Sequence, residues 1–171
     1  MLRWCAVALA GALGGCAVAP PLAVDAAREP SRAVPTGVLA GCRIHLTDVV
    51  DARPNGAHAG DIGRRTVVVS DLAERIARQL EAAGVSRAPG TDRAQLRVEI
   101  ASAYGYGKAT SKAFTTVLVA HHDGERIIAR GNDTAVNWSS GDGELTRGLL
   151  RSADAAIADL AAKLATRCGA S

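Results

Sequence analysis

The sequence predicts an α+β fold in which two helices pack on one face of a four-stranded, mostly antiparallel sheet. Two stretches have the apolar period of an amphipathic helix, four stretches alternate between apolar and polar residues, and their order is β-α-β-β-β-α. Elements of this kind bury their apolar faces against one another as a two-layer sandwich. The sheet face that points away from the helices is then expected to be open to water or to a partner.

The predicted strands are defined by side chains that alternate between the core and the solvent. The clearest is 94–103, where Leu96, Val98 and Ile100 alternate with polar or small residues. Between the last two strands, Asp123-Gly124 has the composition of a tight hairpin turn. The other predicted strands cover residues 43–50, 115–122 and 126–138.

The predicted helices are recognised by apolar residues three or four positions apart. Ser70 is the expected N-cap of the first helix, and Gly84 ends it. The second helix is longer and follows a loop at 139–143. The residues expected to face the core are Leu72, Ile76, Leu80 and Ala83 in the first helix, and Leu145, Leu149, Ala153, Ala156, Ile157, Leu160 and Leu164 in the second.

The N-terminus has the features of a secretory signal: the basic residue Arg3, a short apolar stretch, and small residues before a cleavage site. Leu13-Gly14-Gly15-Cys16 resembles the lipobox of bacterial lipoproteins, in which the cysteine is diacylated and becomes the new N-terminus. The resemblance implies a signal peptide over residues 1–15 and lipidation of Cys16. The alternative is an ordinary signal peptide with a chance cysteine. A transmembrane helix is disfavoured because it needs about 20 apolar residues.

The lipid anchor would determine where the protein is located. Two or more acyl chains hold a protein stably on a bilayer, whereas one chain holds it only marginally. The residue after the lipidated cysteine is Ala17 rather than an aspartate. By resemblance to Gram-negative lipoproteins, this favours the periplasmic face of the outer membrane over the inner membrane.

Residues 16–40 are expected to form the lipidated N-terminus and a proline-rich tether, and residues 41–171 a single periplasmic domain. A flexible tether of this length would reach roughly 25–30 Å. The prolines that interrupt the tether are Pro20, Pro21, Pro30 and Pro35.

Two cysteines remain in the mature chain beyond Cys16, namely Cys42 and Cys168. In an oxidising, exported compartment such a pair predicts a disulfide. Cys42 has the strand parity of Ile44, and Cys168 lies four positions after Leu164, so both thiols are expected to face the core. Two buried thiols are the alternative. A metal site is disfavoured because the spacing is not that of a CxxC pair.

Composition and motifs predict no catalytic residue, no metal site and no cofactor. The net charge is +3 with scattered basic residues, and aromatic residues make up 3% of the chain, which disfavours nucleic acid as a partner. His121-His122-Asp123 is interpreted as a solvated hairpin end, because neighbouring strand residues point to opposite faces. Gly105-Tyr106-Gly107-Lys108 lacks the first glycine and the magnesium-binding hydroxyl of a phosphate loop.

A basic edge is one hypothesis for a binding site. It would consist of Arg64, Arg65, Lys108 and Lys112, brought together by the fold. Such an edge would face anionic lipid or the phosphates of lipid A. Charge reversal at these four positions without any change in lipid binding would contradict the hypothesis.

The mature sequence resembles the YajG family of small bacterial lipoproteins over nearly its whole length. The order of elements also resembles the lipopolysaccharide-assembly lipoprotein LptE and the auxiliary lipoproteins of ABC-type lipid transporters. These resemblances imply no catalytic residues. They are carried by the lipobox, the tether, the strand end Asp48-Val49-Val50-Asp51-Ala52-Arg53-Pro54, the helix end Glu81-Ala82-Ala83-Gly84-Val85, the strand Ala94-Gln95-Leu96-Arg97-Val98-Glu99-Ile100, the turn Asp123-Gly124-Glu125 and the C-terminal helix.

Three functions are compared. The favoured one is a non-enzymatic accessory lipoprotein that binds an envelope protein through the open sheet face or an edge strand, because sheet edges are templates for strand addition. The alternative is a lipid- or lipopolysaccharide-binding protein, which requires an apolar groove between the sheet and the helices. No group of residues supports a periplasmic hydrolase or metal enzyme.

Overall fold

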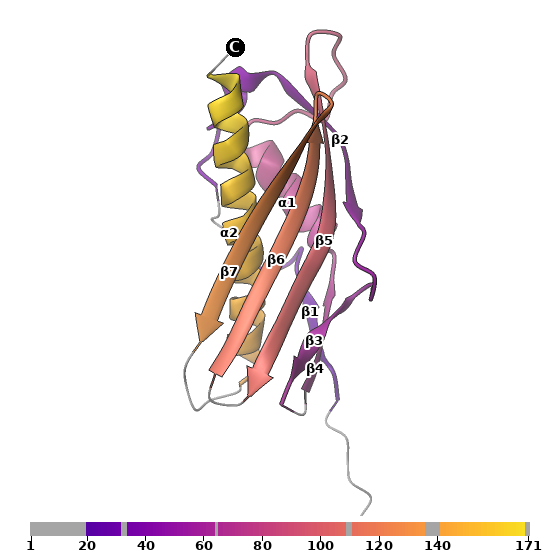
Figure 1. The fold of residues 1–171 in the computed structure, drawn as a ribbon, viewed down its shortest axis with the longest axis vertical. Coiled ribbons are helices and arrows are strands. Elements are labelled where there is room, and N and C mark those ends of the chain that lie inside the picture. The colour runs from indigo at the N-terminus through magenta and orange to yellow at the C-terminus, as the bar shows by residue number, and fades with distance from the viewer. Residues whose placement is uncertain (1–19, 32–33, 64, 109–110, 136–140, 170–171) are drawn as a thin grey trace, which may run out of the picture.

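The computed structural model describes residues 20–31, 34–63, 65–108, 111–135 and 141–169 (Figure 1). Seven strands, two α-helices and one 3₁₀ turn follow one another in this part of the chain. Their bounds are β1 Leu22–Asp25, η1 Ala40–Cys42, β2 Ile44–Asp51, β3 His58–Ile62, β4 Arg65–Ser70, α1 Leu72–Ala82, β5 Ala94–Lys108, β6 Ser111–His122, β7 Glu125–Ala135 and α2 Asp142–Cys168.

The seven strands form one mixed sheet in the order β1-β4-β3-β5-β6-β7, and β2 also pairs with β5. β2 lies along the first half of β5, whereas β3 meets the end of β5 where Ile62 is opposite Gly107. The prediction of a four-stranded, mostly antiparallel sheet is therefore wrong. The α+β class and the presence of two helices are confirmed.

The three strands that the sequence analysis missed are short. β1 has four residues, β3 has five and β4 has six. A strand of this length carries little periodic signal beside prolines and glycines. β1 pairs with β4 in parallel, with Leu22 opposite Val67, so its formation depends on residues that are distant in the sequence.

β2 was expected to join an antiparallel sheet, but it runs parallel to β5. The register extends from Ile44 opposite Ala94 to Asp51 opposite Ile100, with an irregularity after Leu46. Parallel neighbours need a long crossover connection. Here β3, β4 and α1 provide it.

The antiparallel part of the prediction is confirmed in β5, β6 and β7, which form a long meander. The predicted turn between β6 and β7 has positive φ values at both central residues, 52° at Asp123 and 84° at Gly124. This backbone is typical of the hairpin turns that match the twist of the flanking strands.

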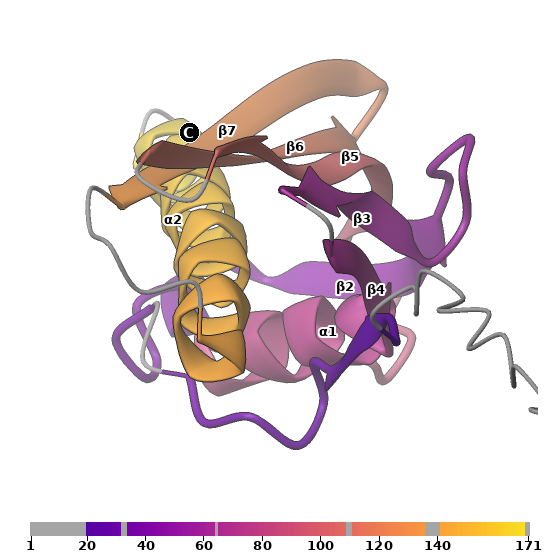
Figure 2. The same cartoon turned by 90° about the horizontal axis from the view of Figure 1, so that it is seen from below.

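Both helices lie on the concave side of the curved sheet, as Figure 2 shows. The apolar positions predicted for the helices are buried, among them Ile76, Leu80, Leu149 and Leu160. In the described residues, no helix combines the length and the apolar character needed to cross a bilayer. The predicted N-cap is displaced by one residue, because Asp71 rather than Ser70 precedes α1.

The contact between α2 and the sheet requires a glycine in the helix. A Cβ on Gly148 would lie 2.6 Å from Cδ2 of Phe114, the fully buried ring of β6. The helix therefore approaches β6 more closely than any other residue at position 148 would allow.

Much of the predicted tether, 16–40, is packed on the domain. β1 takes up residues 22–25, and Ala26 and Leu39 are fully buried. The N–H of Leu39 donates to the oxygen of Ala83, just after α1 (2.6 Å). Only residues 17–21 separate Cys16 from the sheet, so the expected tether of 24 residues is reduced to a short leash.

A buried arginine holds the segment that follows β1. Arg75 of α1 is 2% exposed and donates to the main-chain oxygens of Ala26 (3.1 Å), Glu29 (2.7 Å) and Pro30 (3.1 Å). The same guanidinium donates to both carboxylate oxygens of Asp154 in α2, at 3.0 Å each. A bidentate pair of this kind is geometrically specific. It connects the start of the domain to both helices.

Candidate interaction surfaces

The predicted lipidation site, Cys16, lies outside the described residues. The lipid anchor therefore stays a prediction that depends on the sequence of residues 1–16. What the structure adds is the place where the chain enters the sheet, at Leu22.

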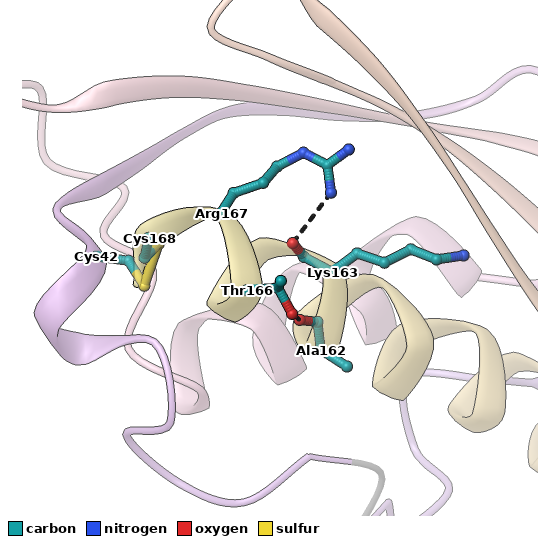
Figure 3. Close-up of a disulfide and its surroundings, with 6 residues drawn as sticks. All are labelled: Cys42, Ala162, Lys163, Thr166, Arg167 and Cys168. Carbon is teal, nitrogen blue, oxygen red and sulfur yellow. Dashed lines mark hydrogen bonds between the residues drawn. A yellow bond between two sulfur atoms is a disulfide. The ribbon is translucent and has the colours of Figure 1, made fainter. Parts of the chain in front are cut away.

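The predicted disulfide between Cys42 and Cys168 is present (Figure 3). The two Cα atoms are 5.3 Å apart, and the bridge spans 126 positions of the sequence. It joins η1, directly before β2, to the last residue of α2. Around it, Arg167 donates to the main-chain oxygen of Lys163 (3.2 Å). The disulfide thus fixes the end of the longest helix to the entrance of the sheet.

The four residues of the predicted basic edge differ in their surroundings. Lys112 is buried and pairs with Glu144 (3.4 Å), so it does not face a lipid surface. Arg65 is partly exposed and pairs with Asp142 (2.8 Å). Arg64 and the side chain of Lys108 lie outside the described residues. Lipid contact at this edge stays a hypothesis, and Lys112 is unsuited to it because it is buried and paired.

The histidine pair and the glycine-rich segment lie where strand geometry expects them. His121 and His122 are the last two residues of β6, and the described residues contain no cluster of three or more groups able to hold a metal ion. Residues 105–108 form the end of β5 and not a phosphate-binding loop. A Cβ on Gly105 would lie 2.8 Å from Cδ1 of Phe114, so this glycine leaves room for the core ring.

One long edge of the sheet, that of β7, is covered by polar side chains of α2. Asp159 accepts from the main-chain N–H of Arg130 (3.0 Å), and Lys163 donates to the main-chain oxygen of Ile128 (2.9 Å). These are main-chain groups that an added strand would need. The same helix makes two further ion pairs with β7, Arg151 with Asp133 (2.8 Å) and Arg167 with Glu125 (3.1 Å).

The carboxylate of Asp159 is held in its charged form. Burial raises its pKa, but hydrogen bonds from Lys163 (2.7 Å) and from the N–H of Arg130 outweigh burial, so the pKa lies below its ordinary value. The cover of the β7 edge is therefore intact at neutral pH.

The outer edge of β2 is different, because Ser86 is its one paired partner in the described part of the chain. Leu46 N–H donates to Ser86 O (2.8 Å), and Ser86 N–H donates to Ile44 O (3.0 Å). The rest of β2, up to Asp51, pairs with β5 alone. Thr47, just beyond Ser86, is exposed.

A hollow of about 150 Å³ lies beside this open stretch, between β2 and α1. Small residues of α1, Ala73 and Ala77, form part of its wall, and charged side chains surround it. The residues that line it are Leu46, Thr47, Asp48, Val49, Ala73, Glu74, Ala77 and Arg87. We call the stretch Thr47–Asp51 together with this hollow the β2 edge. The pattern of the sequence alone does not single out this edge. The alanines four positions apart in α1 were the available signal, but they could be assigned only once β2 was known to lie beside that helix.

The outer face of β5, β6 and β7 is uncovered, as predicted (Figures 1 and 2). Its central row places Val119 opposite Ile128, and near the end of β5 Tyr106 lies opposite Ala113. Tyr106 is 56% exposed. Arginines at the rim, such as Arg126, give this face a mixed apolar and charged surface.

Comparisons with known proteins give distant structural likenesses. No protein-family model matches the chain, and neither does the sequence of any curated protein. The crystal structure of a protein described as uncharacterized is similar with a TM-score of 0.47 and 16% identity, covering 70% of this chain and 92% of that one. Protein XCC0632 from Xanthomonas campestris, assigned to the family DUF330, gives a TM-score of 0.41 and 12% identity, covering 83% and 91%. Likenesses of this size carry no argument about function.

Proposed function

We propose that the chain is a non-enzymatic lipoprotein, anchored through Cys16 to the periplasmic face of the outer membrane, that binds an envelope protein as an accessory module in cell-envelope assembly or transport. The resemblance to transport auxiliary lipoproteins is in keeping with this role, whereas the resemblance to the YajG family implies no particular biochemical role. The partner would add an extended segment to the β2 edge.

The observation that carries the proposal is the contrast between two edges of the sheet, those of β7 and β2; the four-residue strand β1 is a further edge. Side chains of α2 occupy main-chain groups of β7, whereas in the described residues the outer edge of β2 is paired only at Ser86 and is open beyond it. Strand addition needs unpaired main-chain groups and a pocket for alternate side chains. The hollow beside Ala73 and Ala77 has room for a small apolar side chain of the partner.

The alternative, a lipid- or lipopolysaccharide-binding protein, needs an apolar groove between the helices and the sheet. In the described residues that space is filled by side chains that are almost completely buried, such as Leu118, Ile127 and Leu149. The hollows found on the surface have charged residues in their walls. The packing therefore supports the protein-binding role.

The test is photo-crosslinking in living cells from Thr47, followed by mass spectrometry of the adducts from membrane fractions. We expect one envelope protein, and we expect the adduct to be lost in Ala73→Arg, which fills the hollow. Ala162→Arg is the matched control, because it makes the same exchange at an exposed position of α2. A melting temperature equal to that of the wild type in both variants shows that their fold is intact.

Two outcomes would contradict the proposal. A partner that crosslinks from Asn132 on the outer face and not from Thr47 would move the site away from the β2 edge. Lipid without protein in the adducts would favour the lipid-binding alternative.

A further inference from the structure

The short leash fixes which part of the domain lies nearest to the membrane. This step depends on the lipid anchor of the proposed function. From Cys16 to Leu22, the first residue of β1, the chain can extend at most about 20 Å, and a flexible chain of six residues typically spans about 12–15 Å. The domain is much longer than that, since the 15 residues of β5 extend about 50 Å.

The pairing registers identify the end of the domain that the leash holds. Leu22 lies opposite Val67, the third residue of β4 after the turn between β3 and β4. At that turn Ile62 lies opposite Gly107, which in turn lies opposite Lys112 at the start of β6. Figure 1 shows the ends of β3, β5 and β7 at this same lower end. We call it the base end. The turn at Asp123-Gly124 and the disulfide lie at the opposite end.

The base end carries the large apolar side chain that a membrane interface prefers. Tyr106 and Val38 are the two exposed large hydrophobic residues of the described chain, and Tyr106 lies one residue before Gly107. A tyrosine presents an apolar ring and a polar hydroxyl, and such rings are enriched at the level of lipid headgroups.

Charge contributes little at this end in the described residues. Arg65 is matched by Asp142, and Asp61 adds a further exposed carboxylate. The pKa of Asp61 lies below its ordinary value, because Thr66 donates to it and His58 lies beside it, so this carboxylate is charged at neutral pH. Contact with the membrane would therefore depend on the leash and on the tyrosine more than on anionic lipid.

We propose that the base end rests on the lipid surface that holds the anchor, with Tyr106 at the level of the headgroups and the long axis of the domain directed away from the membrane. The β2 edge then has a defined height. Within this edge, Asp48 to Asp51 are in register with residues 97–100 of β5, which lie 7 to 10 residues before Gly107. At about 3.3 Å per residue the β2 edge lies about 23–33 Å above the base end. The partner that binds there reaches this far into the periplasm and does not bind within the bilayer.

The test uses the full lipidated chain in vesicles of phosphatidylethanolamine and phosphatidylglycerol that contain lipids brominated near the headgroup. Trp138→Phe first removes the tryptophan that remains in the mature chain. Tyr106→Trp then reports on the base end, and Arg126→Trp reports on the opposite end of the same outer face. We expect the bromolipid to quench most of the emission at position 106 and little of it at position 126.

A longer leash tests whether the base end lies at the membrane because the connection to Cys16 is short or because the base end is itself attracted to the lipid. Twelve Gly/Ser residues inserted before Pro20 should remove most of the quenching at position 106. In about 1 M salt, where charges are screened within about 3 Å, the quenching should persist. Equal quenching at both positions, or quenching that disappears in salt or survives the longer leash, would overturn this inference.

The mass of the N-terminal peptide shows whether Cys16 carries lipid, and this measurement distinguishes a failure of the proposed function from a failure of the inference alone. A chain without lipid on Cys16 overturns both. A lipidated chain whose Tyr106→Trp reporter is not quenched overturns only the placement of the base end and leaves the partner-binding role in place.

Discussion

Removal of the disulfide should cost a large part of the stability of the domain. The bridge between Cys42 and Cys168 closes a loop of 126 positions. In the chain-entropy model, the bridge changes the entropy of the unfolded chain by −2.1 − 1.5R ln n, where n is the number of residues in the loop. With n of about 126 this change is about −16.5 cal/mol/K, so the bridge stabilises the folded domain by about 5 kcal/mol at 25 °C. For a domain of this size about 1 kcal/mol corresponds to roughly 2–4 °C, so the melting temperature should fall by roughly 10–20 °C.

The assay compares urea unfolding of the oxidised wild type with that of the double variant Cys42→Ser and Cys168→Ser. The variant should unfold at a lower urea concentration and with a steeper dependence on urea, because its unfolded chain is less restricted. Reductant should shift the wild type toward the variant and leave the variant unchanged. A difference in free energy below about 1 kcal/mol would refute the reasoning, since it would mean that the bridge does not restrict the unfolded chain.

Three further predictions concern contacts between the helices and the rest of the domain. Arg75→Met should destabilise the domain by about 3–5 kcal/mol in urea unfolding, because it leaves the carboxylate of Asp154 with the neutral donors Ser31 and Gln79 and without a charged partner. A second change, Asp154→Leu, should restore part of the loss. Gly148→Ala should cost about 1–3 kcal/mol, because its Cβ would overlap the ring of Phe114, whereas Gly143→Ala in the first turn of α2 should not destabilise it. The pKa of Asp159 is lowered in the folded state, so the charged carboxylate stabilises the domain at a pH above its unfolded pKa of about 3.9. This stabilisation is lost as the pH falls through the folded-state pKa. The variant Asp159→Asn should therefore be less stable than the wild type at pH 7, and its stability should depend less on pH in the acid range. An unchanged acid curve would show that this carboxylate does not stabilise the edge.

The sequence predicted those elements whose signal is local. β5, β6 and β7 alternate over long stretches and are joined by short connections, so their order and direction followed from the pattern. β1 and β4 pair across 45 positions, and four residues beside Pro20 and Pro21 carry too little signal to reveal a strand. The parallel pairing of β2 could not be inferred, because the crossover that makes it includes two unpredicted strands.

The same distinction holds for the candidate sites. The disulfide could be predicted because two cysteines remained for one exported domain and Cys168 had a definable face on a long helix. The strand parity assigned to Cys42 was wrong, because Cys42 lies in η1 and not in a strand. Lys112 was grouped into the predicted basic edge because of its charge, but in the structure it shares the inner face of β6 with Phe114 and pairs with Glu144. The β2 edge depends on which strands pair, and that information is not local.

Because the β7 edge is covered, the open β2 edge supports a role in partner binding. An exposed strand of 11 residues would be a strong template for unwanted pairing, and the domain covers β7 with Asp159, Lys163 and two further ion pairs from one helix. On β2, Ser86 covers only the beginning. Beside the remainder α1 presents Ala73 and Ala77 together with Glu74, and Glu74 pairs with Arg87 (3.6 Å). If edge protection were the only requirement, a lysine at the partly exposed position 73 could reach main-chain groups of β2 as Lys163 reaches β7. We therefore expect Ala73→Lys to leave the fold intact and to abolish partner binding, whereas a variant that binds its partner as well as the wild type would show that the β2 edge is open without being used.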